Sequence, residues 1–139
     1  MAQFSVSGLD ELMLTMQEVA VIPEDVIDGI LNDQADALVE HIKLRGEGYG
    51  VVDSGDMLKS IKKGKAKRGK KGGRQIVVSA RGRKRGSKTT NAEIAFLNNY
   101  GTRHQKARPF WSDSEKLSEM TFKKIARDHI DHWLKSKDL

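Results

Sequence analysis

NAEIAFLNNYGTRHQKARPFW, residues 91–111, is the stretch that decides how this chain folds. It opens with an apolar run, residues 94–97, turns at Tyr100-Gly101-Thr102 and crosses a basic segment before Pro109-Phe110-Trp111. Three of the chain's eight aromatic residues fall in the last twelve positions, where large rings can fix how elements meet. Gly101 indicates a backbone position that needs a positive φ or has no room for Cβ, and Pro109 separates the turn from a helix. On chemistry alone, this is a loop and a helix start.

The order of these features resembles the tail-component family of long-tailed phages. These are the gene-product-ten-like proteins, counted among neck, tail-completion and head–tail joining proteins. The apolar run, the aromatic-Gly-Thr turn, the basic spacer and the Pro-Phe pair before a long amphipathic helix carry the resemblance. There are departures: Asn98-Asn99 stands where the family usually has an acidic residue, and Trp111-Ser112-Asp113 replaces the usual Leu-Arg-Pro.

A second segment, DSGDMLKSI at residues 53–61, is similar to the family's Thr/Ser-Gly-x-Leu-x-x-Ser-Ile segment, with one extra residue between glycine and leucine. With the flanking helices, the resemblance covers most of the chain. It implies an α+β fold in which helices pack on a small sheet. It also implies a structural protein of the virion, assembled in the host cytoplasm, that forms rings between the head connector and the tail tube. The fold and interface residues would be Ser54, Gly55, Leu58, Tyr100, Gly101, Thr102, Pro109, Phe110 and Trp111, the last six holding the sheet to the last helix.

Length and composition favour one soluble globular domain, residues 1–139, with 37% hydrophobic and 32% charged residues. The absence of cysteine excludes disulfides and thiolate metal sites. The N-terminus lacks the basic and apolar regions of a secretory signal, and no apolar run approaches the roughly 20 residues that span a bilayer. We expect no cofactor, no membrane and no small-molecule substrate.

The net charge of +6 hides a division along the chain. Residues 57–92 hold fourteen Lys and Arg and no acidic residue, which leaves 25 − 14 = 11 basic against 19 acidic residues elsewhere. Such asymmetry is typical of an arm for a polyanionic or acidic partner. The alternative is a solvated, mobile loop that only keeps the protein soluble.

We expect a flexible arm at about residues 62–74, because this stretch has no apolar period, and a second basic loop at about 81–90. The arm would contact an adjacent ring subunit or DNA in the channel, and ordering it only on assembly would prevent premature rings. Its candidate contact residues are Lys62, Lys63, Lys65, Lys67, Arg68, Lys70, Lys71, Arg74, Arg81, Arg83, Lys84, Arg85 and Lys88.

The apolar periodicity predicts two N-terminal helices. The first begins near Ser7, with Leu9, Leu12, Met13, Met16, Val19 and Ala20 at helical spacing. The second starts at Pro23 and buries one stripe to about Leu44, with His41 as a structural histidine on that stripe. Asp53 or Ser54 would cap a following helical turn, and residues 75–80 form the best strand, antiparallel to residues 60–66.

The C-terminal helix is expected at about residues 113–134, with Ser112 or Asp113 as N-cap. Its buried face would consist of Leu117, Met120, Thr121, Ile125, Ala126, His129, Ile130 and Trp133, and Glu115, Lys116, Glu119, Lys123 and Arg127 would face solvent. The expected α+β fold consists of two N-terminal helices and this long C-terminal helix. They pack on a small antiparallel sheet that carries a long basic hairpin arm.

The sequence contains no recognisable arrangement of catalytic residues, so we predict that the protein is not an enzyme. Two phosphate-loop-like segments, residues 64–70 and 82–89, each lack part of the motif and are chance matches. His129 and His132 with Asp128 and Asp131 are a polar helix edge rather than a metal site. Two function classes remain: a phage neck or tail assembly protein, or a small basic nucleic-acid-binding protein. The basic stretch has no aromatic residue for stacking on bases, which favours the first class.

Overall fold

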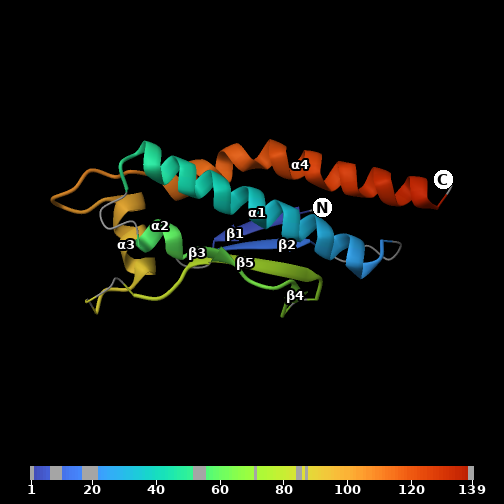
Figure 1. Cartoon of the computed structure of the whole chain (residues 1–139), viewed down its shortest axis with the longest axis horizontal. Helices are drawn as coiled ribbons and strands as arrows, with labels where there is room; N and C mark the ends of the chain where they lie inside the picture. The colour runs from blue at the N-terminus through green and yellow to red at the C-terminus, as the bar shows by residue number, and fades with distance from the viewer. Residues whose placement is uncertain are drawn as a thin grey trace.

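The protein has an α+β fold in a computed structural model that describes residues 2–6, 11–16, 22–51, 56–70, 72–83, 86 and 88–137, the first two segments as backbone only. This confirms the predicted class and the long C-terminal helix. The elements in chain order are β1 (Ala2–Val6), β2 (Glu11–Met16), α1 (Glu24–Gly48), α2 (Asp56–Ser60), β3 (Ile61–Lys63), β4 (Lys67–Arg68), β5 (Arg74–Ala80), α3 (Asn91–Tyr100) and α4 (Phe110–Ser136) (Figure 1).

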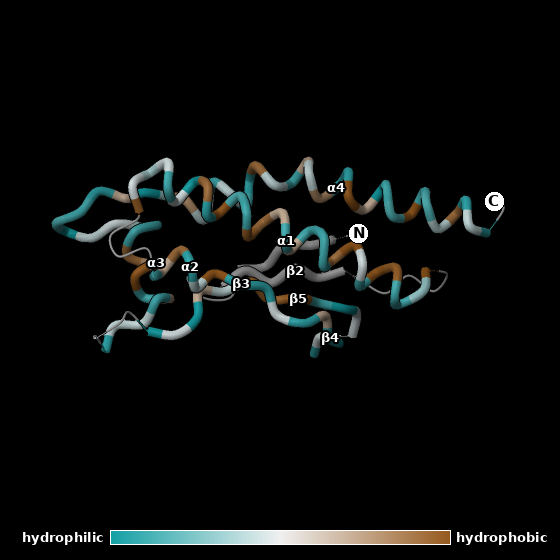
Figure 2. Tube along the Cα trace, viewed as in Figure 1, coloured by the Kyte–Doolittle hydropathy of each residue, from teal (hydrophilic) through white to brown (hydrophobic). Residues whose placement is uncertain are grey.

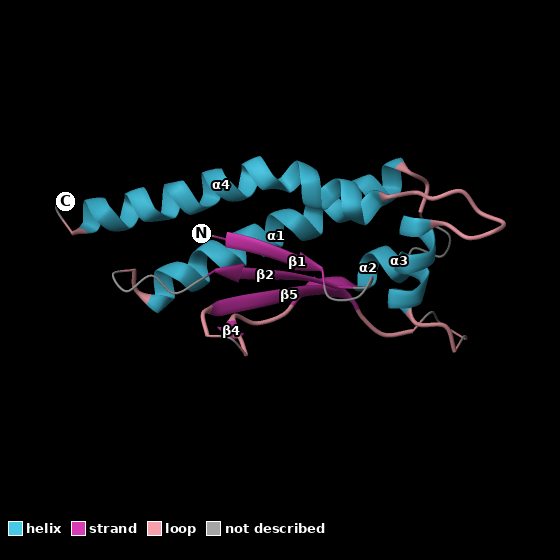
Figure 3. Ribbon diagram, turned by 180° about the vertical axis from the view of Figure 1, so that it is seen from behind, coloured by secondary structure: helices cyan, strands magenta, loops and turns pink. Residues whose placement is uncertain are grey.

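The two long helices α1 and α4 run antiparallel on one face of the sheet, and no described helix covers the other face (Figures 1 and 3). Burial along β5 follows this arrangement. Ile76, Val78 and Ala80 are buried beneath the helices, while the alternate residues of the strand remain partly exposed. A strand that points successive side chains to opposite faces of a half-covered sheet requires this alternation.

The sheet is antiparallel throughout, in the order β1-β2-β5-β3, and β4 also pairs with β5. The predicted strand at residues 75–80 is therefore confirmed, with one more residue at its start. Its expected antiparallel partner is confirmed as β3, which places Ile61 opposite Ala80.

The first of the two predicted N-terminal helices is wrong, because residues 11–16 of that segment form β2, which pairs antiparallel with β1 just before it. The residues 12, 14 and 16 also repeat at a spacing of two, and their Cα atoms lie opposite Val78, Ile76 and Arg74. The segment thus carries both periods. When β2 pairs with β5, the backbone N–H and C=O groups along that edge of β5 gain hydrogen-bond partners. A helix in this segment would leave those groups unpaired.

The prediction that residues 62–74 form an unpacked flexible arm is wrong for the parts of that segment that lie in strands or against the core. β3 and β4 both pair with β5, and Ala66 packs against the core. A backbone ladder needs no apolar side chains, so a Lys-rich sequence can form one. Because the hairpin is already part of the sheet, the idea that it becomes ordered only on assembly loses its basis.

Helix α1 begins after Pro23 as predicted and extends one turn past Leu44, to Gly48. The glycine at 46 lets α2 approach closely, because a Cβ there would lie 2.5 Å from Cδ2 of Leu58. Met57, Leu58 and Ile61 are buried, as expected for a helical turn that begins near residue 56. The proposed caps Asp53 and Ser54 lie outside the described residues.

The predicted buried face of α4 is wrong in its first half. Leu117 and Met120 are exposed, and Ser114, Ser118 and Phe122 are buried instead. The face toward α1 uses small polar residues, which hydrophobic periodicity does not detect. The helix also starts at Phe110, so neither Ser112 nor Asp113 is its N-cap.

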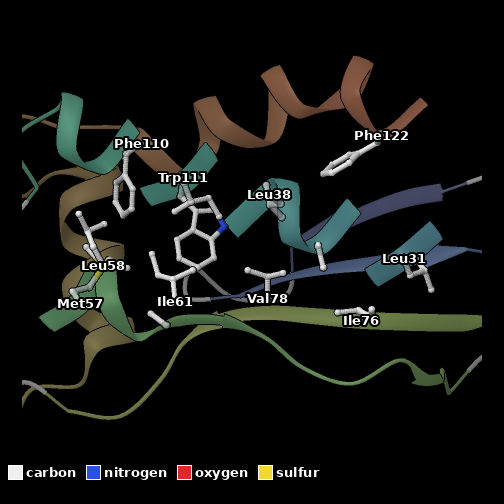
Figure 4. Close-up of a cluster of buried hydrophobic side chains, with 14 of the residues drawn as sticks. Leu31, Leu38, Met57, Leu58, Ile61, Ile76, Val78, Phe110, Trp111 and Phe122 are labelled. Atoms are coloured by element: carbon white, nitrogen blue, oxygen red, sulfur yellow. The ribbon is translucent and has the colours of Figure 1, made fainter. Parts of the chain in front are cut away.

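One cluster of buried apolar side chains joins α1, α2, β3, β5, α3 and α4. In Figure 4, the Trp111 ring points from α4 toward the sheet above Ile61 and Val78, and the Phe110 ring points toward Leu58. The two rings meet edge to face at a centroid distance of 6.2 Å, a favourable geometry for aromatic pairs.

We predict that Phe110→Ala lowers the free energy of unfolding by about 3–5 kcal/mol, because the ring is fully buried and its removal leaves a cavity. Urea unfolding measures this. The matched control is Met120→Ala on the same helix, where the side chain is 81% exposed and the change should stay within about 0.5 kcal/mol. Equal stability of wild type and Phe110→Ala would remove Phe110 from the core.

Candidate functional site

The stretch at residues 91–111 folds into a joint between α3 and α4. The side chain of Thr90 caps α3 by accepting a hydrogen bond from the backbone N–H of Glu93 at 3.1 Å. This helix was not predicted, although Thr90 followed three residues later by Glu93 is the signature of a helix start. The apolar run at residues 94–97 belongs to α3.

Asn99 connects the two helices. Its Oδ1 accepts hydrogen bonds from the backbone N–H groups of Trp111 and Ser112, both at 3.1 Å, and its Nδ2 donates to Oγ of Ser112 at 2.8 Å. Pro109, the residue at the N-cap position of α4, makes no side-chain cap. The cap of α4 is therefore supplied by a buried side chain of α3.

The neighbouring Asn98 holds the loop between the helices. Its backbone carbonyl accepts from the N–H of Arg108 at 2.7 Å, and its Oδ1 accepts from Nε2 of Gln105 at 3.0 Å. The Asn98-Asn99 pair, which departs from the family pattern, thus makes internal contacts that fix the joint. The presence of two asparagines at these positions does not by itself indicate that they hold the joint.

Gly101 meets both conditions expected from the sequence. Its φ is +78°, and a Cβ there would lie 2.7 Å from the backbone N of Ala107 and 2.9 Å from the carbonyl O of Gln105. Its own N–H donates to the carbonyl of Leu97 at 2.9 Å and ends α3. No other residue fits this position without moving backbone.

The structure brings some of the predicted motif residues together and separates others. Leu58, Phe110 and Trp111 are buried in one cluster. Pro109 comes directly before Phe110, at the N-cap position of α4. Tyr100 and Thr102 are exposed, so they do not hold the sheet to the last helix as predicted. Ser54 and Gly55 lie outside the described residues.

Two of the predicted arm residues are engaged by acidic side chains of α1. Arg74 donates from Nε and Nη2 to the carboxylate of Asp28, both at 2.8 Å, and lies 3.3 Å from Glu24. Lys63 forms an ion pair with Asp36 at 2.9 Å. These cations attach β5 and the edge strand β3 to α1, so their charges are used within the fold.

The other described arm residues are exposed and form no ion pair within the described segments. They are Lys62, Lys65, Lys67, Arg68, Lys70, Arg81, Arg83 and Lys88. Figure 2 shows the β4 hairpin and the loop before α3 as mainly hydrophilic. Lys71, Lys84 and Arg85 lie outside the described residues. These exposed side chains form a cationic surface along the β3–β4 edge and the following loop.

The histidines of the helix pair have structural partners. Nδ1 of His41 lies 2.6 Å from Oγ of Ser118, as expected for a satisfied core histidine, and Nε2 of His129 lies 2.6 Å from Oδ2 of Asp33. Asp128 bonds Lys124, whose ammonium group lowers the pKa of that carboxyl. Within the described segments, no three His, Asp or Glu side chains are grouped so as to hold a metal ion.

Glu115 is a half-buried carboxyl on α4, where the sequence predicted a solvent-facing residue. Burial raises its pKa to about 7. Near neutral pH, this part of α4 therefore carries a carboxyl that is partly protonated.

Comparison of the chain with protein-family models, with curated proteins and with solved structures found no match. Among the described helices, none is both long enough and apolar enough to cross a membrane.

We predict that Gly101→Ala lowers the free energy of unfolding by more than about 1 kcal/mol, because the new Cβ is strained at positive φ and meets backbone atoms. Gly48→Ala is the matched control. At the end of α1, a Cβ at position 48 meets nothing within 4 Å, so this change should raise stability by up to about 1 kcal/mol. Equal effects of the two substitutions in chemical denaturation would contradict the strain at 101.

We also predict that Glu115→Gln removes a pH dependence of stability. The carboxyl loses its proton near pH 4.5 in the unfolded chain and near pH 7 in the folded one, so wild-type stability falls as the pH rises between these values. The variant should match wild type near pH 4 and exceed it at pH 8 by on the order of 1 kcal/mol, after allowance for the solvent-exposed part of the group. Glu119→Gln, at an exposed position of α4, is the control. A constant difference between Glu115→Gln and wild type at all pH values would contradict this account.

Proposed function

We propose that this chain is a structural protein of phage virion assembly that acts in the neck or tail, in tail completion or head–tail joining. Copies of the chain form a ring between the head connector and the tail tube. The connector, neck and tail-tube proteins are its partners, and DNA in the channel can make non-specific contact with the cationic surface.

The observation that carries this proposal is the meeting of the two sequence motifs in space. The segments at residues 53–61 and 100–111 are far apart in the sequence. In the fold, Leu58 and Ile61 of the first segment lie beneath Phe110 and Trp111 of the second (Figure 4). Two weak motifs that form one packed unit support the resemblance more than either motif alone. Side chains that join α2, β3 and α4 are what such a unit needs to fix the long helix on the sheet.

The shape of the fold also suits an assembly protein. The long helices cover one face of the sheet, and no helix of the described segments covers the other; large apolar side chains of α1, α3 and α4 remain exposed. Exposed apolar groups in such number favour contacts with other chains.

We predict that deleting this gene from a phage that carries it yields filled heads alongside separate tails, as seen by electron microscopy of the particles. The joint would be missing, because head and tail assemble separately. Tails of uniform length would favour an adaptor on the head side, and overlong tails would favour a terminator. Supplying the gene from a plasmid should restore joined virions, and normal infectious particles without the gene would contradict the proposal.

The second candidate is a small nucleic-acid-binding protein, and the cationic surface is the observation that favours it. Residues 57–92 contain no aromatic side chain for stacking on bases. Binding to duplex DNA would therefore depend on phosphate contacts, lose affinity steeply with salt and show no sequence preference. Normal virions in the deletion experiment would make this the leading candidate.

A further inference from the structure

A groove lies between α1 and α4, with two leucines among polar side chains. It has a volume of ≈ 300 Å³ and is lined by His41, Leu44, Arg45, Leu117 and Thr121. Leu44 is 57% exposed and Leu117 52% exposed, and Met120, one turn further along α4, is also exposed. Since the face of α4 toward α1 is built from Ser114 and Ser118, these larger apolar residues are left outside the core.

A second exposed apolar surface lies on α3. Glu93, Leu97 and Tyr100 are all exposed and recur at a spacing of four and three residues, so they form one ridge along the helix. The Tyr100 ring lies with its centroid 5.4 Å from that of Phe96, which limits the orientations open to it.

We propose that the ridge Glu93–Leu97–Tyr100 of one copy docks into the α1–α4 groove of a second copy. This inference rests on the proposed ring and names the surfaces that would build it. An amphipathic helix that places residues at i, i+4 and i+7 into an apolar groove is a recurring mode of recognition. Leu97 and Tyr100 would contact Leu44 and Leu117. The flexible side chain of Met120 would adapt its shape to the aromatic ring of Tyr100.

Charge favours a second copy as the occupant. Arg45 lines the groove and has no acidic partner in the described part of its own chain, and Glu93 at one end of the ridge has no basic partner there. In the proposed contact, the carboxylate of Glu93 meets the guanidinium of Arg45, and Leu97 and Tyr100 lie beside Leu44 and Leu117.

The contact would be head-to-tail, because the ridge and the groove are different surfaces on different elements. A contact of this kind cannot close in a dimer and instead generates a ring or an open chain of subunits. A few apolar side chains on each surface give weak pairwise binding, and closure of a ring strengthens it because each subunit is held on two sides.

Site-directed cross-linking tests this proposal, because the chain has no cysteine and each introduced thiol is unique. Two full-length variants, Leu97→Cys and Leu117→Cys, are mixed at high concentration and oxidised with copper–phenanthroline, and the products are separated by mass. We expect the mixed 97–117 disulfide to exceed both homodimers by at least tenfold. The control pairs Leu97→Cys with Lys123→Cys, an exposed position of α4 that does not line the groove.

A charge exchange gives a second measurement on the same contact. Arg45→Glu and Glu93→Arg should each reduce the yield of the mixed disulfide several-fold, and combining Glu93→Arg on the ridge variant with Arg45→Glu on the groove variant should restore it. A mixed yield no higher than that of the control, or homodimers in equal amount, would overturn the proposal. If the gene deletion separates heads from tails but this cross-link is absent, the assembly role stands and the surfaces are wrong. If the cross-link forms and virions without the gene are normal, the contact stands without a role in the neck.

Discussion

The cap that Asn99 places on the first turn of α4 is the contact on which the rest of the architecture depends. A helix start exposes backbone N–H groups that need acceptors, and here two of them bond the same carboxamide oxygen of a residue on α3. Because this start lies among buried side chains, water cannot replace the cap at low cost. The bond therefore fixes where α4 begins, and with it the positions of the two aromatic rings, Phe110 and Trp111, that follow.

The contact between α1 and α4 is polar for a helix pair that forms much of the core. Gln34 donates to the carbonyl of Phe122 at 3.0 Å, His41 bonds Ser118, and Gly29 gives room to His129. Small side chains let the helices approach, and the hydrogen bonds specify one register between them. The same choice of residues turns Leu117 and Met120 outward, so the way the monomer packs creates the apolar surface that a partner would cover.

Some basic side chains of residues 57–92 form ion pairs within the fold, and others are exposed to solvent. The acidic face of α1 engages Arg74 on β5 and Lys63 on the edge strand β3, which neutralises part of the basic segment within the fold. The other described cations of this segment, such as Lys67, Arg68 and Arg83, are exposed to solvent. An edge strand rich in Lys resists pairing with another sheet, because bringing like charges together is unfavourable. This makes helix surfaces better candidates than the sheet edge for contacts between copies.

The α+β class was implied by the resemblance of the sequence motifs to a known family. The sequence by itself determined the helix after Pro23, the strand at residues 75–80 with its antiparallel partner, the strict need for glycine at 101 and the burial of Phe110. Each of these follows from local chemistry: a fixed φ, a run of β-branched residues, a missing Cβ or a hydrophobic period. Only the tertiary structure decided that residues 11–16 form a strand, since that segment carries two periods and the open edge of β5 selects one. It also decided that a Lys-rich segment pairs with β5, that serines face α1 and that Asn99 caps α4, because each depends on a partner distant in the chain that no local pattern reveals.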